Sequence, residues 1–380
     1  MTIEWLTVLC LTVTAIGCMY NIAAALATRR FCAPAASSTR HPSITVLKPL
    51  RGSEPALYAN LASFCDQNYD APVQILFGVQ SASDTCLDLV RGLIADRPEH
   101  DLQLVVDPHE HGSNAKVSNL INMASHAKHD VIIVSDSDIR VEPDYLREIS
   151  AMLHQPGVGL VTCMYRGQAA AGNWSRLAAM AIDYQFFPSV MLGVRIQLAR
   201  PCFGSTIALR RRTLKDIGGF AAFANHLADD NMMGEAVRQT GMQVAIANCV
   251  VTHMCGELSA VELIQHELRW ARTIRAVDPW GFIGSVVTYP LPFAFAVMVL
   301  SGFSAWALAT LALTIVCRQA LRKKVYHALG YSAGPAWLLP LRDLLSFAVF
   351  ISSFLIDVVR WRGRRYRVRA DGTLVPIKQP

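Results

Sequence analysis

The stretch Val131-Ile-Ile-Val-Ser-Asp-Ser-Asp138 predicts both the fold class of this chain and the place of a candidate site. Its first four residues are apolar and β-branched, which is typical of a strand buried on both faces. Asp136 and Asp138 follow at the carboxyl end of that strand, where open α/β sheets bind their ligands. Their spacing places both carboxylates on one side of an extended chain. Such a pair can hold Mg²⁺ or Mn²⁺ beside substrate phosphates, although Asp and Ser are also common in simple turns.

Short runs rich in valine and isoleucine recur along the middle of the chain. We expect strands at residues 43–47, 73–77, 102–106, 131–134, 205–210 and 243–247. Helical patterns lie at residues 57–68, 84–95, 230–239 and 259–275, and the last opens with the capping box Ser259-Ala-Val-Glu262. This alternation predicts a mostly parallel sheet with crossover helices, a Rossmann-like α/β fold. The sequence contains neither a Gly-x-Gly-x-x-Gly motif nor a Walker loop, so the usual sequence evidence for dinucleotide or ATP binding is missing.

The N-terminal segment has the composition of a membrane anchor. No residue from Trp5 to Thr28 is charged, which is a length sufficient to span a bilayer. Arg29 and Arg30 follow this segment instead of preceding it, unlike the basic residues of a secretory signal. We therefore expect an uncleaved anchor with the following segment in the cytoplasm.

Two further apolar regions lie near the C-terminus. Residues 281–317 carry no charge and are long enough for two tight helices, whereas residues 344–359 form a shorter apolar region. The basic clusters at 318–324 and 360–369 both favour a cytoplasmic location, which one simple spanning helix between them cannot satisfy. A re-entrant or interfacial segment around residues 337–340 would allow both basic clusters to lie in the cytoplasm. The alternative is one long helix followed by a basic cluster that is an exception to the cytoplasmic preference of basic residues.

Composition narrows the class of protein. Hydrophobic residues make up 52% of the chain and charged residues 17%, which is poor in charge for a soluble protein. Much of the net charge of +6 comes from residues 360–369, and beside a membrane segment anionic lipids are a better partner for it than nucleic acid. The ten cysteines form no Cys-x-x-Cys pair, which argues against a disulfide framework or a zinc site. The sequence His253-Met-Cys255 fits a strand end better than a pair of metal ligands.

Acidic residues recur in order along the globular region. They are Asp84 after one predicted strand, Asp136 and Asp138 after another, and Asp229 and Asp230 at the start of a predicted helix. The sequence His266-Glu-Leu-Arg269-Trp270 then lies on the last helix before the C-terminal apolar block. Taken singly, each aspartate could be a helix N-cap and the Arg-Trp pair an interfacial anchor. As an ordered set they favour a common site.

This ordered set resembles glycosyltransferases of families 2 and 21, whose pattern is Asp, Asp-x-Asp, a later Asp, and [Gln/Arg]-x-x-Arg-Trp. The segments Val46-Leu-Lys-Pro-Leu50, Asn114-Ala-Lys-Val-Ser-Asn-Leu120 and Ala228-Asp-Asp230 look like ceramide glucosyltransferases and their bacterial relatives. The run from His266 to Arg275 looks most like the hopanoid-associated glycosyltransferases, and the resemblance covers about residues 45–275 plus the membrane segments. The chain departs from the motif at His266, where Gln or Arg is usual.

The resemblance implies a GT-A fold and an inverting, metal-dependent transfer of a hexose from a UDP-sugar to a lipid hydroxyl. Asp138 would be the main ligand of Mg²⁺ or Mn²⁺, with Asp136 supporting it. Asp230 would be the general base, with Asp229 as the alternative. The residues that would bind the nucleotide sugar are Asp84 for the uridine, Asn114 and Lys116 at the nucleotide end, Asp136 and Arg269 near the diphosphate, and Trp270 against the sugar or acceptor.

The same resemblance implies the partners and the location. The expected acceptor is a hopanoid polyol with UDP-N-acetylglucosamine as donor, and ceramide with UDP-glucose is the alternative. A processive polysaccharide synthase and a non-catalytic nucleotide-sugar sensor remain further alternatives. We expect a multi-pass protein of the bacterial inner membrane whose catalytic domain faces the cytoplasm.

The expected domain organisation has five parts. They are an anchor at 1–30, a linker at 31–42, a cytoplasmic GT-A domain at 43–279, membrane segments at 280–360 and a basic tail at 361–380. Residues 167–201 are unusually apolar for a loop region, and they would belong to the core or line a lipid entry.

Overall fold

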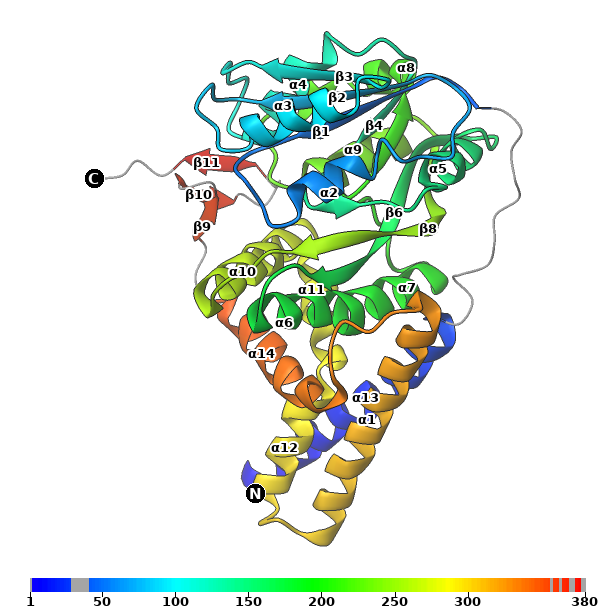
Figure 1. Cartoon of the computed structure of the whole chain (residues 1–380). Helices are drawn as coiled ribbons and strands as arrows, with labels where there is room; N and C mark the ends of the chain where they lie inside the picture. The colour runs from blue at the N-terminus through cyan, green and yellow to red at the C-terminus, as the bar shows by residue number, and fades with distance from the viewer. Residues whose placement is uncertain (1, 29–40, 356–357, 362–363, 369–372, 377–380) are drawn as a thin grey trace. The chain divides into compact units, whose positions relative to one another are not determined.

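The computed structural model describes residues 2–28, 41–355, 358–361, 364–368 and 373–376 (Figure 1). The chain divides into two compact units. The helical unit contains residues 1–32, 171–200 and 257–371, and the sheet unit contains residues 33–170, 201–256 and 372–380. Residues 171–200 and 257–279, which we expected within the globular domain, therefore belong to the helical unit. All but the last two residues of the expected linker lie outside the described residues.

An eight-stranded sheet in the order β3-β2-β1-β4-β7-β6-β8-β5 forms the sheet unit (Figure 1). The strands are β1 Ile44–Pro49, β2 Val73–Val79, β3 Asp101–Val106, β4 Val131–Val134, β5 Ile139–Arg140, β6 Val158–Ala169, β7 Ile207–Arg210 and β8 Gln243–Cys255. Strands β3, β2, β1 and β4 are parallel, as predicted. Beyond β4 the sheet is mixed, because β7 pairs antiparallel with β4 and β6, and β5 pairs antiparallel with β8.

The residues of β4 are apolar because both faces of the strand are buried. Val131 and Ile133 pack into one buried cluster, and Ile132 and Val134 pack into another on the opposite face. Both faces are covered by helices, so the alternation of side chains places every residue of the strand in a core. The helices of the sheet unit are α2 Leu57–Ala62, α3 Leu87–Asp96, α4 Ala115–Ala124, α5 Tyr145–Leu153, α8 Arg211–Asp216 and α9 Asp229–Gln239, with a 3-10 turn at Phe220–Phe223.

Strand β8 is much longer than the sequence predicts. We expected a strand at residues 243–247, but β8 continues to Cys255 and pairs in parallel with β6, a strand that the sequence pattern did not indicate. Asn248, Thr252 and His253 break the apolar pattern, and the register between β6 and β8 shifts twice. The extension brings the end of β8 beside β5, immediately after the Asp-x-Asp sequence.

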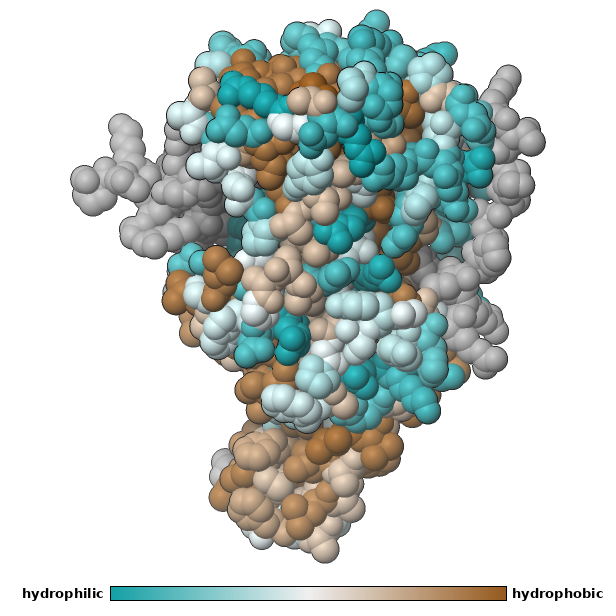
Figure 2. All heavy atoms as spheres, in the orientation of Figure 1, coloured by the Kyte–Doolittle hydropathy of each residue, from teal (hydrophilic) through white to brown (hydrophobic). Residues whose placement is uncertain are grey.

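In the helical unit, α1 Thr2–Thr28 packs against α12 Pro290–Leu300 and α13 Ala305–Leu329. Their outer surface is predominantly hydrophobic (Figure 2). The remaining elements are α6 Asn173–Ala181, a π-helical turn at Ile182–Phe186, α7 Phe187–Arg195, α10 Ala260–Val277, α11 Pro279–Gly284, 3-10 turns at Ser285–Thr288 and Ala336–Leu338, and α14 Leu339–Ser352. The apolar region at 167–201 is thus largely helical, with Tyr184, Phe187 and Met191 buried.

Among the described residues, two helical stretches are long and apolar enough to cross a membrane, Ile3–Thr28 and Asn173–Arg195. The pair Pro279–Thr288 and Pro290–Leu300, bent by 57°, would add a third if it formed one span. Helix α14 has 14 residues, or about 21 Å, and is shorter than the roughly 30 Å of a hydrocarbon core. The topology of this region stays a prediction.

Two arginine–carboxylate pairs lie inside the helical unit. Arg318 of α13 binds Asp343 of α14 through two hydrogen bonds of 2.7 and 2.5 Å, and neither side chain exceeds 5% exposure. The neighbouring Arg342 binds Glu267 of α10 through two hydrogen bonds of 2.7 and 2.6 Å. Each of these two arginines therefore faces one carboxylate in bidentate geometry.

The basic C-terminal region is only partly described. Strand β9 Val358–Trp361 pairs antiparallel with β10 Arg364–Val368, and β11 Leu374–Pro376 follows. The expected lipid-binding role of this tail therefore stays a prediction.

Candidate active site

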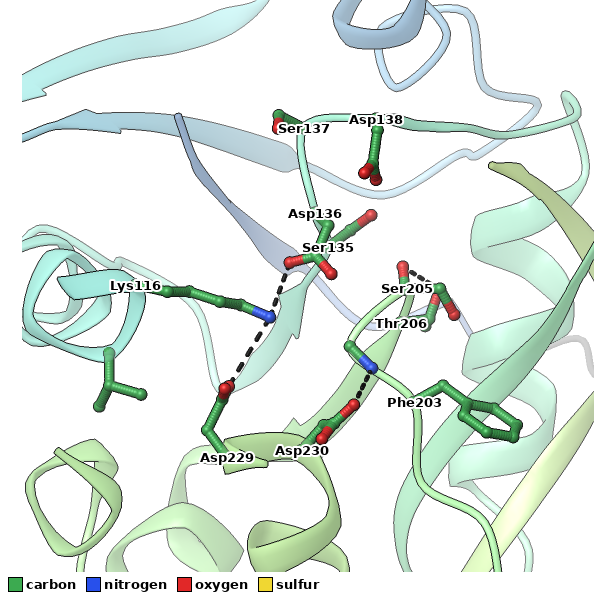
Figure 3. Close-up of polar contacts among 12 residues, drawn as sticks. Lys116, Ser135, Asp136, Ser137, Asp138, Phe203, Ser205, Thr206, Asp229 and Asp230 are labelled. Atoms are coloured by element: carbon green, nitrogen blue, oxygen red, sulfur yellow. Dashed lines mark hydrogen bonds and ion pairs between the residues drawn. The ribbon is translucent and has the colours of Figure 1, made fainter. Parts of the chain in front are cut away.

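Lysine and carboxylate side chains from three elements converge at the carboxyl edge of β4. The ammonium of Lys116, in the first turn of α4, lies 2.6 Å from Oδ1 of Asp136 and 3.6 Å from Oδ2 of Asp229 (Figure 3). Burial lowers the pKa of Lys116, but the negative charges of Asp136, Asp229 and Asp230 outweigh burial and raise it. Lys116 is therefore a permanent cation that partly neutralises this cluster.

Asn114 holds the amino end of α4 and one carboxylate of the cluster. Its side-chain oxygen accepts hydrogen bonds from the backbone N–H groups of Lys116 and Val117, as an N-cap residue does. Its amide nitrogen donates to Oδ1 of Asp229 at 3.2 Å, and the side chain is fully buried. These contacts support a positioning role for Asn114, and its expected contact with a nucleotide stays a prediction.

Asp230 and its neighbour Asp229 open helix α9 but have different surroundings. Oδ2 of Asp230 accepts a 2.8 Å hydrogen bond from the backbone N–H of Gly204 (Figure 3). Oδ1 accepts a hydrogen bond from the backbone N–H of Asn231. Burial and the charge of Asp229 raise the pKa of Asp230 to about 6, although Lys116 acts in the opposite direction. Asp229 itself is 5% exposed and lies between Asn114 and Lys116.

Gly204 leaves room for these groups to approach one another. A Cβ atom at this position would lie 2.9 Å from Oδ2 of Asp136, 2.9 Å from Nζ of Lys116 and 3.5 Å from Oδ2 of Asp230. The first two distances are shorter than ordinary van der Waals contact. A side chain at residue 204 would therefore displace the cluster.

Asp138 lies on the other side of the Asp-x-Asp loop from Lys116. Its Oδ1 is 3.5 Å from Nδ1 of His253, near the end of β8. Between the two aspartates, the hydroxyl of Ser137 donates to Oε2 of Glu54 at 2.9 Å. Burial and the charge of Asp138 raise the pKa of Glu54 to about 7.

Lys48 stabilises the Asp-x-Asp loop through hydrogen bonds to Ser135 and Asp136. This lysine of β1 is fully buried, and its ammonium donates to the backbone carbonyl of Asp136 at 2.5 Å and to the hydroxyl of Ser135 at 3.4 Å. It also lies over the ring of Phe64, 4.1 Å from the centroid. Burial lowers the pKa of Lys48 to about 7, opposed by the charges of Asp138 and Asp136.

Asp84 connects two loops at the same edge of the sheet. Its Oδ1 accepts hydrogen bonds from the backbone N–H groups of Gly52 and Cys86, at 2.8 and 3.0 Å. Burial raises the pKa of Asp84, but these bonds and the charge of Arg51 outweigh burial and lower it. Asp84 thus stabilises the loops after β1 and β2, and its expected contact with uridine stays a prediction.

The Arg-Trp motif lies on α10 in the helical unit. Ser259 caps this helix as predicted by accepting a hydrogen bond from the N–H of Glu262. His266 hydrogen-bonds Glu257 at 2.6 Å, and its ring packs edge-on against Trp270, with centroids 4.4 Å apart. The residue that departs from the family motif therefore contacts the tryptophan of that motif. Arg269 lies on the same helix and is partly exposed.

The donor atoms in the sheet unit fit a divalent cation that takes its other ligands from a substrate. No group of three or more His, Cys, Asp or Glu side chains suited to a metal ion occurs within the part of the chain that the structure describes. Mg²⁺ and related ions often bind only one or two carboxylates and complete their coordination with phosphate oxygens and water. Asp138 and Asp136 can supply such carboxylates.

The sequence therefore pointed to most of the polar cluster but missed several members. Asp136, Asp229, Asp230, Lys116 and Asn114 come together in the sheet unit, and Asp138 lies on the same loop as Asp136, beside His253. Lys48, Glu54, Gly204 and His253 were not assigned to the site. Lys48 could have been suspected, because a lysine inside the apolar run 44–50 must find a buried acceptor.

Comparison with known proteins identifies the family. A model described as glycosyl transferase family 21 matches residues 9–374. Two ceramide glucosyltransferases of Caenorhabditis elegans, numbered 1 and 3, are 23% and 24% identical to this chain. The first match covers 88% of this chain and 73% of the relative, and the second covers 89% and 75%.

A solved structure shares the fold. It is the mannosyltransferase PcManGT from Pyrobaculum calidifontis in complex with GDP-Man and Mn²⁺, with a TM-score of 0.54 and 18% identity. The match covers 92% of this chain and 99% of that protein. The sheet unit and its mixed eight-stranded sheet thus have the expected GT-A-like architecture.

Proposed function

This chain belongs to glycosyl transferase family 21, and on that premise we propose that it transfers one sugar from a UDP-sugar to the hydroxyl of a membrane lipid with inversion. The observation that carries this proposal is the cluster of Asp136, Lys116, Asp229 and Asp230 at the carboxyl edge of β4. Such an edge is where open α/β sheets bind nucleotides.

Asp230 is the proposed general base. An acceptor hydroxyl must lose its proton as it attacks the anomeric carbon, and a carboxylate with a pKa near the working pH accepts that proton well. The pKa of Asp230 is raised to about 6, and the backbone N–H of Gly204 orients its carboxylate. Asp229 is more deeply buried and contacts Asn114 and Lys116, which supports a positioning role for it.

The leaving diphosphate needs positive charge as the bond to the sugar breaks. A divalent cation bound at Asp138, with Asp136 beside it, would supply Lewis-acid stabilisation of that charge. Lys116 places a permanent positive charge in the same cluster. By the family resemblance, Arg269 would bind the diphosphate and Trp270 would present an apolar face to the sugar or acceptor.

For the acceptor we propose a hopanoid polyol with UDP-N-acetylglucosamine as donor, as the run from His266 to Arg275 suggests. The second candidate is ceramide with UDP-glucose, which the names of the curated relatives favour. Both acceptors present a hydroxyl on an apolar body, which suits a protein with membrane helices. We further propose that the protein resides in the bacterial inner membrane with the sheet unit in the cytoplasm.

Product analysis tests the proposal. The purified full chain in lipid nanodiscs is incubated with each UDP-sugar and each lipid class, and products are identified by mass. A product that carries one added hexose or N-acetylhexosamine is expected, whereas a ladder of longer products would favour a processive synthase. A ceramide product would replace the hopanoid assignment. Nucleotide binding without transfer to any lipid would favour a sensor.

A further inference from the structure

We propose that His266, held by Glu257, is a positioning residue that fixes the ring of Trp270 in one orientation toward the substrate. The inference rests on the proposed function, because it concerns the apolar face that Trp270 would present to the sugar or acceptor. His266 is also the residue at which the chain departs from the family motif. Its contacts within the helical unit give this departure a physical meaning.

The backbone around Glu257 is tied to the helix that carries His266. Oγ of Ser259 accepts a hydrogen bond from the N–H of Glu262, in the first turn of α10. Oε2 of Glu262 in turn accepts a hydrogen bond from the N–H of Leu258 at 2.8 Å. Glu257 is the next residue towards the N-terminus, so its backbone is held beside the start of α10.

The carboxylate of Glu257 holds the imidazole of His266. Glu257 is only 7% exposed, and its Oε1 lies 2.6 Å from Nδ1 of His266. An ionised carboxylate only accepts hydrogen bonds, so Nδ1 carries the hydrogen and donates it. Hydrogen bonds to a charged acceptor are among the stronger side-chain contacts, and this one restricts the orientation of the imidazole ring.

The imidazole in turn contacts the indole of Trp270. Residues four positions apart lie one above the other on the same face of a helix. The two ring centroids are 4.4 Å apart and the ring planes meet at 73°, which is the edge-on arrangement that aromatic rings prefer. The imidazole that Glu257 holds therefore restricts the side-chain torsions of Trp270.

Helix α10 itself is held by a different contact. Glu267 accepts two hydrogen bonds, of 2.7 and 2.6 Å, from the buried Arg342 of α14. Arg342 also donates to the carbonyl oxygen of Leu177 on α6. These contacts limit rotation of α10 about its axis, so the orientation of the indole is what remains to be fixed, and His266 contacts that ring.

A fixed indole binds a substrate better than a mobile one. Trp270 is partly exposed, so part of its ring can contact a substrate. Less side-chain freedom is lost on binding when the ring is already ordered. Gln and Arg have more rotatable bonds than His and restrain a neighbouring ring less firmly. His266 therefore lowers the KM of the substrate that Trp270 contacts.

Fluorine NMR of protein labelled with 5-fluorotryptophan tests the orientation directly. The full chain is measured in detergent, and the signal of Trp270 is identified as the one that disappears in Trp270→Leu. We expect one sharp signal from the parent protein and a shifted or broadened signal from His266→Gln. Glu257→Gln keeps the shape of the side chain but removes its charge, so it should give a smaller change of the same kind.

Kinetics in lipid nanodiscs measure the consequence for binding. His266→Gln should raise the KM of either the UDP-sugar or the lipid about three- to tenfold, with kcat changed less than about twofold. The KM that rises identifies the substrate that Trp270 contacts. In a Trp270→Leu background the same substitution should have no further effect on KM, because His266 acts through Trp270.

His327→Gln is the matched control, because His327 is an exposed histidine of the same unit whose ring packs against Tyr326. It should change neither the Trp270 signal nor either KM. An unchanged Trp270 signal in His266→Gln would overturn the inference, and so would a fall in Tm with signal and KM unchanged. An effect of His266→Gln on KM that persists in the Trp270→Leu background would also overturn it, since that result indicates direct contact between His266 and the substrate.

Failure of this inference can be separated from failure of the proposed function, because the NMR measurement needs no substrate. Sugar transfer by a protein whose Trp270 signal is insensitive to His266 would overturn only the positioning role. A Trp270 signal that depends on His266, in a protein that transfers no sugar to any lipid, would leave the ring contact standing and remove the proposed transferase activity.

Discussion

Charged side chains are buried in both units of this protein, but they are arranged differently: two arginine–carboxylate pairs lie in the helical unit, and a cluster with more carboxylates than lysines lies in the sheet unit. In the helical unit, Arg318 faces Asp343 and Arg342 faces Glu267, one arginine for each carboxylate. In the sheet unit, the charges that converge near β4 are Glu54, Asp136, Asp138, Asp229 and Asp230 against Lys48 and Lys116. An arginine paired with one carboxylate is typical of a contact with a structural role. An excess of negative charge at the edge of a sheet is instead typical of a site that binds a cation or transfers a proton.

Removing the proposed base should have the largest effect on activity. Asp230→Asn keeps the shape of the side chain but cannot accept a proton, so we expect transfer to fall by about a hundredfold or more. The measurement is initial rate with a saturating UDP-sugar. Asp216→Asn on α8 is the control, because that exposed carboxylate has only a loose contact with Arg212 and should leave the rate unchanged. Normal activity of Asp230→Asn would show that another group is the general base.

Breaking a balanced pair should affect stability. Arg318→Met leaves Asp343 buried without its arginine, and we expect a loss of about 3–5 kcal/mol, measured by thermal unfolding in detergent. The double variant Arg318→Met/Asp343→Leu removes both charges and should recover most of the stability and the activity. A double variant that is folded but inactive would show that the Arg318–Asp343 pair is needed for activity. The pair would then not have a purely structural role, contrary to the distinction drawn between the two units.

Adding one methyl group inside the unbalanced cluster should lower activity without unfolding the protein. The Cβ of Gly204→Ala would lie 2.9 Å from Asp136 Oδ2 and from Lys116 Nζ, so both must shift. We expect kcat/KM to fall roughly ten- to a hundredfold, because small displacements of reacting groups are costly. Gly92→Ala on α3, where nothing lies within 4 Å of the new atom, is the matched control. Equal activity in both variants would show that the cluster tolerates displacement.

The smallest expected effect is on the pH profile. Asp230 acts as a base when deprotonated, and its pKa is raised to about 6 by burial and by the charge of Asp229. Transfer should therefore fall as pH drops through about 6. Asp229→Asn removes the neighbouring charge, lowers the pKa of Asp230 and moves this decline to lower pH. The measurement is kcat/KM against pH for both proteins, and a shift to higher pH would contradict the proposed coupling.

The contrast also shows which parts of the molecule could be predicted. The parallel strands β1 to β4 were expected, because an apolar β-branched run between turn residues has few alternatives. Helix α1 and the capped start of α10 were predicted for similar local reasons. Strand β6 and most of β8 were not predicted from the sequence. Their polar residues break the local pattern of a strand, and the two strands are stabilised by pairing between residues that are far apart in the chain.

The sequence by itself determined that Asp136 and Asp138 follow a doubly buried strand, and that Asp229 and Asp230 open a helix, because these features depend on neighbouring residues. Only the tertiary structure decided which charges are balanced. Lys116 lies between Asp136 and Asp229, His253 lies beside Asp138, and Arg318 faces Asp343. These contacts join residues that are 20 to 115 positions apart, and the energy of a charge depends on what surrounds it in space.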